Sequence, residues 1–280
     1  MNKLKITGER FHPEIGGKAS LEHFSRYFFT KKIIENKVVL DIACGEGYGS
    51  FYMSKFAKKV FGLDIIKDTI DHARFNYSNK NLKYEQSSIY EIPFEDNFFD
   101  IVVCFETIEH VIDQLKAIIE LKRVLKKDGV LIISTPNSME YNDKNNPLLS
   151  KFHEKELSKL EFINLISSNF NFINELSQSF IYGTMIEPDE SVLNYIEYES
   201  SEFLGQKWSI PKKEFFIVLA SDLNHEFKFP YMVFNNYNLS LTEIDFLVGL
   251  KLKKIKNNFR YRLIDFLFSP YDWLKKILKN

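Results

Sequence analysis

Three glycines, each separated by a single residue, follow an apolar run in "KVVLDIACGEGYGS", residues 37–50. The run at 38–42 has the length and composition of a buried strand and carries the acid Asp41 near its end. Glycine lets a ligand approach the backbone, and open α/β sheets bind ligands beyond the carboxyl ends of their strands. The stretch therefore predicts a strand, a ligand-binding turn and a helix.

The rest of the chain alternates between strand-like and helix-like segments. We predict strands at 38–42, 59–63, 82–86, 99–105, 129–134, 170–176 and within 214–221, and helices at 19–36, 48–57, 67–76, 111–126 and 154–167. Strands such as "IVVCF" and "VLIIS" are continuously apolar, as in a parallel sheet that is buried on both faces. The pattern predicts an α/β fold with helices on both faces of the sheet.

Composition divides the chain into three parts. We expect an N-terminal lid segment at 1–36, a main domain at 37–235 with an irregular insertion at about 183–211, and a C-terminal appendage at 236–280. The appendage is basic, aromatic and helical in periodicity. It would suit either an anionic membrane surface or a partner chain, and the oligomeric state stays open.

The overall composition favours a cytoplasmic protein that does not bind nucleic acid. A net charge of −1 provides no general attraction for phosphate backbones. The two cysteines, Cys44 and Cys104, form no zinc-binding pattern and suit a reducing compartment. The N-terminus has charges and a proline in place of the apolar segment of a signal peptide, and no apolar run is long enough to span a bilayer.

The residues around the glycines favour a cationic ligand. A dinucleotide-binding turn would have glycine or alanine where this chain has Ser50, and the Gly-Lys-Ser/Thr of a P-loop is absent. Asp41 and Glu46 would repel a pyrophosphate but suit S-adenosylmethionine (SAM), which has a sulfonium and an ammonium. Asp64 ends the second strand, where an acid can bind both ribose hydroxyls of SAM or equally of NAD.

Four motifs together resemble the class I SAM-dependent methyltransferases: "VLDIACGEGYG", "GLDI", "IYEIPFEDNFFDIVVCFETIEHV" and "LKKDGVLIISTPN". The resemblance implies a Rossmann-like sheet of seven mostly parallel strands. It also implies that the methionine part of SAM meets Asp41, Ala43, Gly45 and Gly47, that Asp64 binds the ribose, and that Ile65 contacts the adenine. The family often has an acid for the adenine amino group where this chain has Ser88. The Ser88 hydroxyl or the backbone of Ile89 would take over that role.

The segment "FETIEHV" after the fourth predicted strand should face the transferred methyl group. One interpretation makes His110 a general base oriented by Glu109, and another makes both residues structural. In a third, Glu106, Glu109, His110 and the distant His153 resemble the divalent-metal ligands of small-RNA 2'-O-methyltransferases. Oxygen and imidazole ligands suit magnesium or manganese.

The acceptor is predicted by resemblance alone. "GERF", followed by "EH" and "RY", resembles methyltransferases encoded among bacterial surface-polysaccharide genes, which implies a sugar or phosphorylated small-molecule acceptor in glycan synthesis. In such a lid, Arg26 would hold the methionine carboxylate of SAM or an acceptor phosphate. The alternatives are RNA or small-metabolite methylation, and a non-catalytic scaffold protein with the SAM-binding fold.

Overall fold

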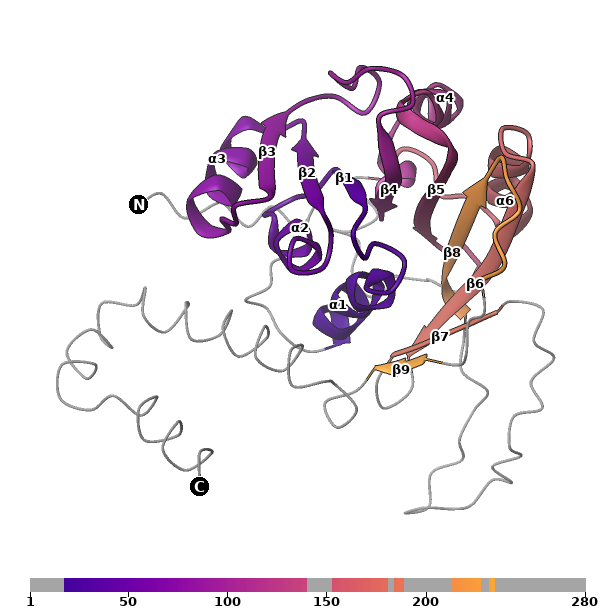
Figure 1. Cartoon of the computed structure of the whole chain (residues 1–280). Coiled ribbons are helices and arrows are strands. Elements are labelled where there is room, and N and C mark those ends of the chain that lie inside the picture. The colour runs from indigo at the N-terminus through magenta and orange to yellow at the C-terminus, as the bar shows by residue number, and fades with distance from the viewer. Residues whose placement is uncertain (1–17, 140–152, 181–183, 189–212, 228–231, 235–280) are drawn as a thin grey trace, which may run out of the picture.

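A nine-stranded sheet forms the centre of the computed structural model, which describes residues 18–139, 153–180, 184–188, 213–227 and 232–234 (Figure 1). The strands lie in the order β3-β2-β1-β4-β5-β8-β6-β7-β9. Their bounds are β1 Val38–Ile42, β2 Lys59–Asp64, β3 Leu82–Gln86, β4 Phe99–Phe105, β5 Leu125–Pro136, β6 Phe172–Phe180, β7 Thr184–Pro188, β8 Lys213–Ser221 and β9 Met232–Phe234. The helices are α1 Lys18–Thr30, α2 Tyr48–Met53, α3 Lys67–Asn76, α4 Gln114–Val124 and α6 Lys159–Ser167, with a short 3-10 helix η1 at Ile108–His110.

The first five strands of the order are parallel, and β1 is the middle one. It pairs with β2 on one side and β4 on the other, and β3 and β5 extend the sheet outward. The carboxyl ends of these strands therefore meet at one edge. The strand order reverses between β1 and β4, which is the place where open α/β sheets bind their ligands.

Beyond β5 every strand pairing is antiparallel, among the residues that the structure describes. The seven predicted strands are present as β3-β2-β1-β4-β5-β8-β6. Their pairings are mostly parallel, as predicted, with β8 and β6 antiparallel. Two further short strands, β7 and β9, continue the sheet. β7 lies within the insertion predicted as irregular at 183–211, so that prediction was wrong for residues 184–188. A five-residue segment such as β7 shows no clear alternation of apolar and polar residues. It becomes a strand because it pairs with β6.

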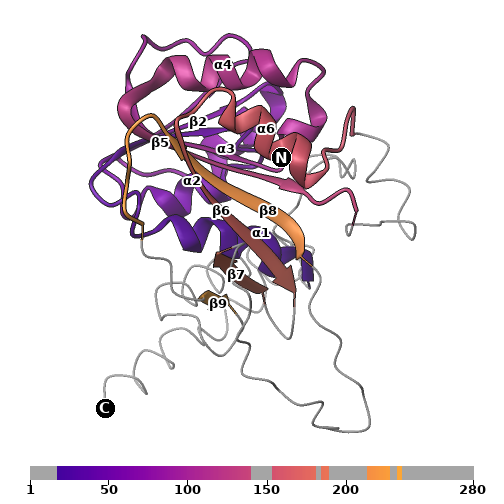
Figure 2. The same cartoon turned by 90° about the vertical axis from the view of Figure 1, so that its right-hand side faces the viewer.

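Helices cover both faces of the sheet, as the sequence predicts (Figure 2). Side chains of α1, α2 and α3 form one apolar cluster with one face, and those of α4 and α6 form another with the opposite face. The neighbouring residues Val102 and Val103 of β4 belong to different clusters, because successive side chains of a strand point to opposite faces. This double burial explains why the parallel strands are continuously apolar.

Local capping sets the starts of two helices that begin later than predicted. Asp113 accepts a hydrogen bond from the backbone N–H of Lys116 and starts α4 three residues later than expected. Ser158 and Glu161 form a capping box that starts α6 at residue 159 and not at 154. Helix α1 ends at Thr30, six residues before its predicted end.

Three predicted segments fall wholly or mainly outside the described residues. These are positions 1–17 of the lid segment, positions 183 and 189–211 of the insertion, and the whole appendage at 236–280. In the part of the chain that the structure does describe, none of the helices has both the length and the apolar character needed to cross a membrane.

The turn between β1 and α2 uses left-handed backbone at Ala43, Gly45 and Gly47, with φ values of 54°, 54° and 87°. The two glycines differ in their surroundings. A Cβ built on Gly45 has no atom within 4 Å, whereas one on Gly47 would lie 2.7 Å from Ala73 Cβ and 2.8 Å from the Tyr84 ring. Gly47 is thus needed for packing against α3 and β3, and Gly45 leaves space above the backbone.

We therefore expect Gly47→Ala to be much more destabilising than Gly45→Ala. Both substitutions place a side chain in the left-handed region, which costs about 1–2 kcal/mol. Gly47→Ala adds overpacking of about 1–3 kcal/mol. Urea unfolding of both variants measures the difference, and equal losses of stability would contradict the packing role of Gly47.

Candidate active site

The Asp64 carboxylate holds the glycine turn in place. Its Oδ2 accepts a hydrogen bond from Gly45 N at 3.0 Å, and its Oδ1 accepts one from Ile66 N at 2.9 Å. Asp64 lies at the end of β2, and Gly45 lies in the turn that follows the neighbouring strand β1. One side chain thus joins the ends of two adjacent strands. Each oxygen keeps a lone pair that can accept from a ligand hydroxyl.

Asp41 lies beneath the turn and is fully enclosed. Ser50 Oγ donates to its Oδ2 at 2.5 Å, and the Tyr27 hydroxyl lies 3.5 Å from its Oδ1. Burial raises the pKa of this carboxyl to about 7, although both hydrogen bonds lower it. Asp41 therefore ties α1 and α2 to β1, while Ala43 is the exposed residue of the turn.

A pH-dependent stability follows from the raised pKa of Asp41. In the unfolded chain this carboxyl has an ordinary pKa near 3.8, so between about pH 4 and pH 7 the folded protein binds more protons. Stability contributed by this group is therefore present at low pH and is lost as pH rises towards 7. Asp41→Asn should reduce the fall in unfolding free energy across this range by an amount on the order of 2–4 kcal/mol.

Urea unfolding at several pH values checks this prediction. The matched control is Asp68→Asn, because Asp68 is an exposed acid in the first turn of α3. An Asp41→Asn profile parallel to that of the wild type would contradict the assignment.

The predicted adenine contacts lie after β2 and β3. Ile65 is 64% exposed directly after Asp64, which gives an apolar side chain for a flat ring to cover. The Ser88 hydroxyl accepts from Tyr90 N at 3.2 Å, so its hydrogen can still be donated. The Ile89 side chain belongs to the core, so only its backbone can face a ligand.

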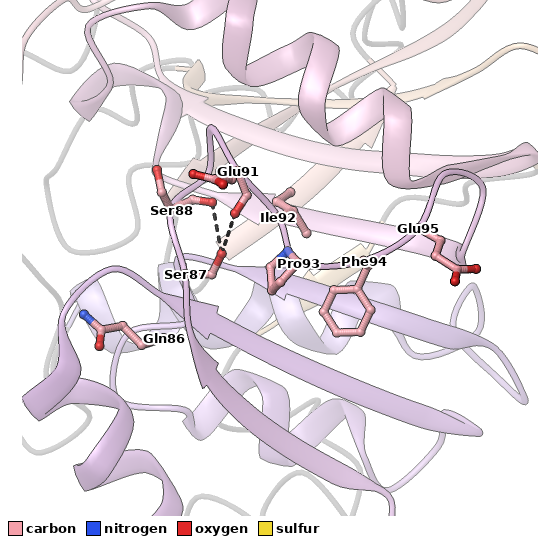
Figure 3. A pocket seen from close by; sticks show the side chains of 8 residues that line it. All are labelled: Gln86, Ser87, Ser88, Glu91, Ile92, Pro93, Phe94 and Glu95. Atoms are coloured by element: carbon pink, nitrogen blue, oxygen red, sulfur yellow. Dashed lines mark hydrogen bonds between the residues drawn. The ribbon is translucent and has the colours of Figure 1, made fainter.

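A pocket of about 620 Å³ borders this region (Figure 3). Its wall runs from the end of β3 through the following loop, where Ser87 Oγ donates to the carbonyl oxygens of Ser88 and Glu91. The lining residues are Gln86, Ser87, Ser88, Glu91, Ile92, Pro93, Phe94 and Glu95. Ser88 is the one residue that this pocket shares with the predicted adenine contacts. The glycine turn does not line it.

Glu106 follows β4 in a left-handed conformation, with φ of 49°. Ser134 of β5 fixes it, because Ser134 Oγ donates to Glu106 Oε1 at 2.6 Å and Glu106 N donates to the Ser134 carbonyl. Left-handed backbone at a residue other than glycine is strained and is concentrated at functional sites. The Arg26 guanidinium lies 3.8 Å from the same carboxylate oxygen.

Glu109, His110 and His153 come together as predicted. His153 lies 43 positions after His110, and part of the chain between them is outside the described residues. One ligand atom from each residue lies within 4.8 Å of the others. Hydrogen bonds from Glu154 N and Lys155 N to the Glu109 carbonyl bring the two segments together. This donor set fits a divalent cation. Glu106 is outside the group, since its carboxylate binds Ser134.

The surroundings of Glu109, His110 and His153 favour the neutral form of the Glu109 carboxyl. Burial and then the negative charge of Glu106 raise the pKa of Glu109 above its usual range, against a hydrogen bond from Thr135. His110 Nε2 lies 3.9 Å from Glu109 Oε1, which is too long for a hydrogen bond. His153 Nδ1 lies 2.6 Å from Glu156 Oε1. The sequence analysis missed Glu156, although it lies three residues after His153 and just before a helix.

Arg26 is buried on α1, with a relative exposure of 1%. Its Nη1 donates to Gln178 Oε1 at 2.7 Å, and its guanidinium lies over the Phe215 ring at 4.7 Å. Gln178 is on β6 and Phe215 is on β8, where the two are register partners. The sequence analysis did not identify Gln178, because its partner is 152 residues away and no short motif connects them.

Comparison with known proteins agrees with this arrangement. Residues 40–133 match the methyltransferase domain family. Over these residues, which are less than half of the chain, the sequence is similar to that family. The matched residues run from β1 into β5 and thus include Asp41, Asp64 and Glu109. The match supports the methyltransferase resemblance over the segment that holds the glycine turn.

Individual relatives cover more of the chain. It is 31% identical over 173 residues to a "probable S-adenosylmethionine-dependent methyltransferase" of Mycolicibacterium smegmatis. This match covers 59% of this chain and 64% of that protein. A ubiquinone biosynthesis O-methyltransferase of Actinobacillus pleuropneumoniae is 37% identical over 108 residues, covering 36% of this chain and 46% of its own length. The chain therefore spans less than two thirds of either relative.

A solved structure supports the fold. The YcgJ protein of Bacillus subtilis superposes with a TM-score of 0.51 at 21% identity, covering 72% of this chain and 100% of its own. At this level of identity the similarity concerns the fold, which is the one the sequence predicts.

Proposed function

We propose that the protein transfers the methyl group of SAM to an oxygen of a small acceptor. The observation that carries this proposal is the turn around Gly45, which has open space above its backbone and is held by the Asp64 carboxylate. Asp64 can accept the ribose hydroxyls, and Ile65 can cover the adenine. The described turn has no basic side chain to hold a pyrophosphate, which favours SAM over a dinucleotide.

Calorimetric titration with S-adenosylhomocysteine (SAH), the demethylated product, tests the cofactor assignment. Asp64→Asn keeps one acceptor for the turn but loses the charge and an acceptor oxygen, so SAH binding should weaken by about 10- to 100-fold. Asp68→Asn removes an exposed carboxylate four residues later and should leave the affinity unchanged.

Two results would contradict the proposal. A wild-type protein that binds neither SAM nor SAH would favour the scaffold alternative. Unchanged SAH affinity in Asp64→Asn would place the cofactor elsewhere. Gly45→Ala provides an independent check, since its Cβ enters the open space above the turn and should weaken SAH binding while destabilising the fold less than Gly47→Ala does.

For the acceptor, we propose a sugar or a phosphorylated small molecule of glycan synthesis. Support comes from the N-terminal sequence resemblance and, for oxygen as the methylated atom, from the name of the ubiquinone O-methyltransferase relative. The net charge of −1 argues against RNA. Methyl transfer to a hydroxyl needs alignment with the S–CH₃ bond and removal of one proton.

Two roles are open to the cluster of Glu109, His110 and His153. His110 can remove the acceptor proton, because its side chain is partly exposed beside the buried Glu109. Alternatively, the three residues hold a divalent cation, which would supply a Lewis acid for the acceptor oxygen. In the first role His153 only packs edge-on against His110, with ring centroids 4.8 Å apart.

Substitution of each histidine separates the two roles. If His110 is a general base, His110→Ala should lower turnover of a hydroxyl acceptor by about 10²–10⁴-fold, and His153→Ala should have a much smaller effect. If a cation binds, both variants should lose manganese or zinc binding in a calorimetric titration, and EDTA should inhibit the wild type. SAH affinity is the control, and turnover that survives in both variants would exclude both roles.

A further inference from the structure

Arg26 has two nitrogen atoms that no group in the described structure uses. Nε and Nη2 are both buried and have no hydrogen-bond partner, whereas Nη1 donates to Gln178. A buried donor without a partner costs about 1–3 kcal/mol. Such a group in a folded protein calls for an explanation, and a bound ligand is one.

The two unused nitrogens lie on the same edge of the guanidinium. Nε–H and one N–H of Nη2 point in the same direction, while Nη1 belongs to the opposite edge. This is the edge that binds a carboxylate or a phosphate through two parallel hydrogen bonds. Two contacts fix the orientation of the guanidinium. Gln178 accepts a hydrogen bond from Nη1, and the Phe215 ring lies against the guanidinium.

The position of Arg26 places Nε and Nη2 on the side of the site where the methyl acceptor is proposed to bind, after β4 and β5. Its side chain contacts Gln178 of β6, Phe215 of β8 and Glu106, the residue after β4. Phe215 is the register partner of Pro136, the last residue of β5, so the guanidinium lies at the carboxyl edge of β4 and β5. Glu106 and Glu109, which follow β4, lie at that same edge.

Glu106 does not satisfy the arginine. Its Oε1 lies 3.8 Å from Nη1, beyond hydrogen-bond distance, and accepts instead from Ser134 at 2.6 Å. Arg26 therefore keeps a charged edge free for an oxyanion.

From these contacts we propose that Arg26 binds a carboxylate or phosphate group of the methyl acceptor through Nε and Nη2. This inference rests on the proposed methyltransferase function and specifies its acceptor as an anion. A carboxylate or phosphate both accepts from the two donors and neutralises the buried charge, whereas the hydroxyls of a neutral sugar can only accept from the donors. Gln178 is a positioning residue that holds the guanidinium for this contact, with Nε2 anchored to Glu22 O and Ser25 Oγ of α1.

The test uses the full chain saturated with SAH and inorganic phosphate or acetate as the probe. Calorimetry should detect binding of at least one probe by the wild type. Arg26→Gln should weaken that binding at least about tenfold. Lys32→Gln removes the same charge from an exposed position just after α1 and should not change it. Arg26→Lys keeps the charge without the two-donor edge and should recover only part of the affinity.

The source of the anion needs a separate measurement, because the methionine carboxylate of the cofactor has the same chemistry. SAH has this carboxylate and methylthioadenosine lacks it. If Arg26 serves the acceptor, Arg26→Gln should bind both adenosine compounds as the wild type does. If the variant loses the preference for SAH over methylthioadenosine, Arg26 binds the cofactor and the inference is wrong.

Failure of this inference is distinct from failure of the proposed function. A wild type that does not bind SAH overturns the function. A wild type that binds SAH but neither phosphate nor acetate, or an Arg26→Gln variant that binds the probe normally, overturns only the acceptor assignment. Thermal unfolding of each variant shows whether the fold is retained, and Arg26→Lys provides the measurement if Arg26→Gln does not fold.

Discussion

The site depends on a single carboxylate that connects two strand ends. Asp64 of β2 accepts the backbone N–H groups of Gly45 and Ile66, so it shapes the turn after the neighbouring β1 and the start of the segment leading to α3. Each of these bonds involves a charged acceptor, and such bonds are stronger than those between neutral groups. In the proposed cofactor site, the group that builds the turn is thus also the group that recognises the ribose.

The sequence predicted those parts of the fold that depend on neighbouring residues. Apolar runs and glycines placed the parallel strands and the turn within a few residues of their true bounds, because burial on both faces leaves a continuous apolar pattern. The extra strand β7 escaped prediction, since a five-residue strand is defined by its partner β6 and not by its own pattern. Helix ends moved where capping side chains, such as Asp113, compete with apolar periodicity.

In the candidate site, too, residues within a motif could be predicted, whereas their partners from distant segments could not. Asp64 and Gly45 follow from a motif, and the structure brings Glu109, His110 and His153 together as the spacing suggested. Their bonding partners could not be predicted. Glu106 binds Ser134 of the neighbouring strand, 28 residues on, and thus leaves the expected metal-ligand group. Gln178 and Phe215 meet Arg26 only because β6 and β8 pair beside α1.

The contact between Arg26 and Gln178 also affects how the protein assembles during synthesis. Helix α1 leaves the ribosome well before β6, because the side chain that orients its arginine comes 152 residues later. Contacts between residues so distant in sequence form late, because a long loop must close first. The parallel strands and the glycine turn need only nearby segments. The contact that orients Arg26 therefore forms after the part of the site that contains the glycine turn.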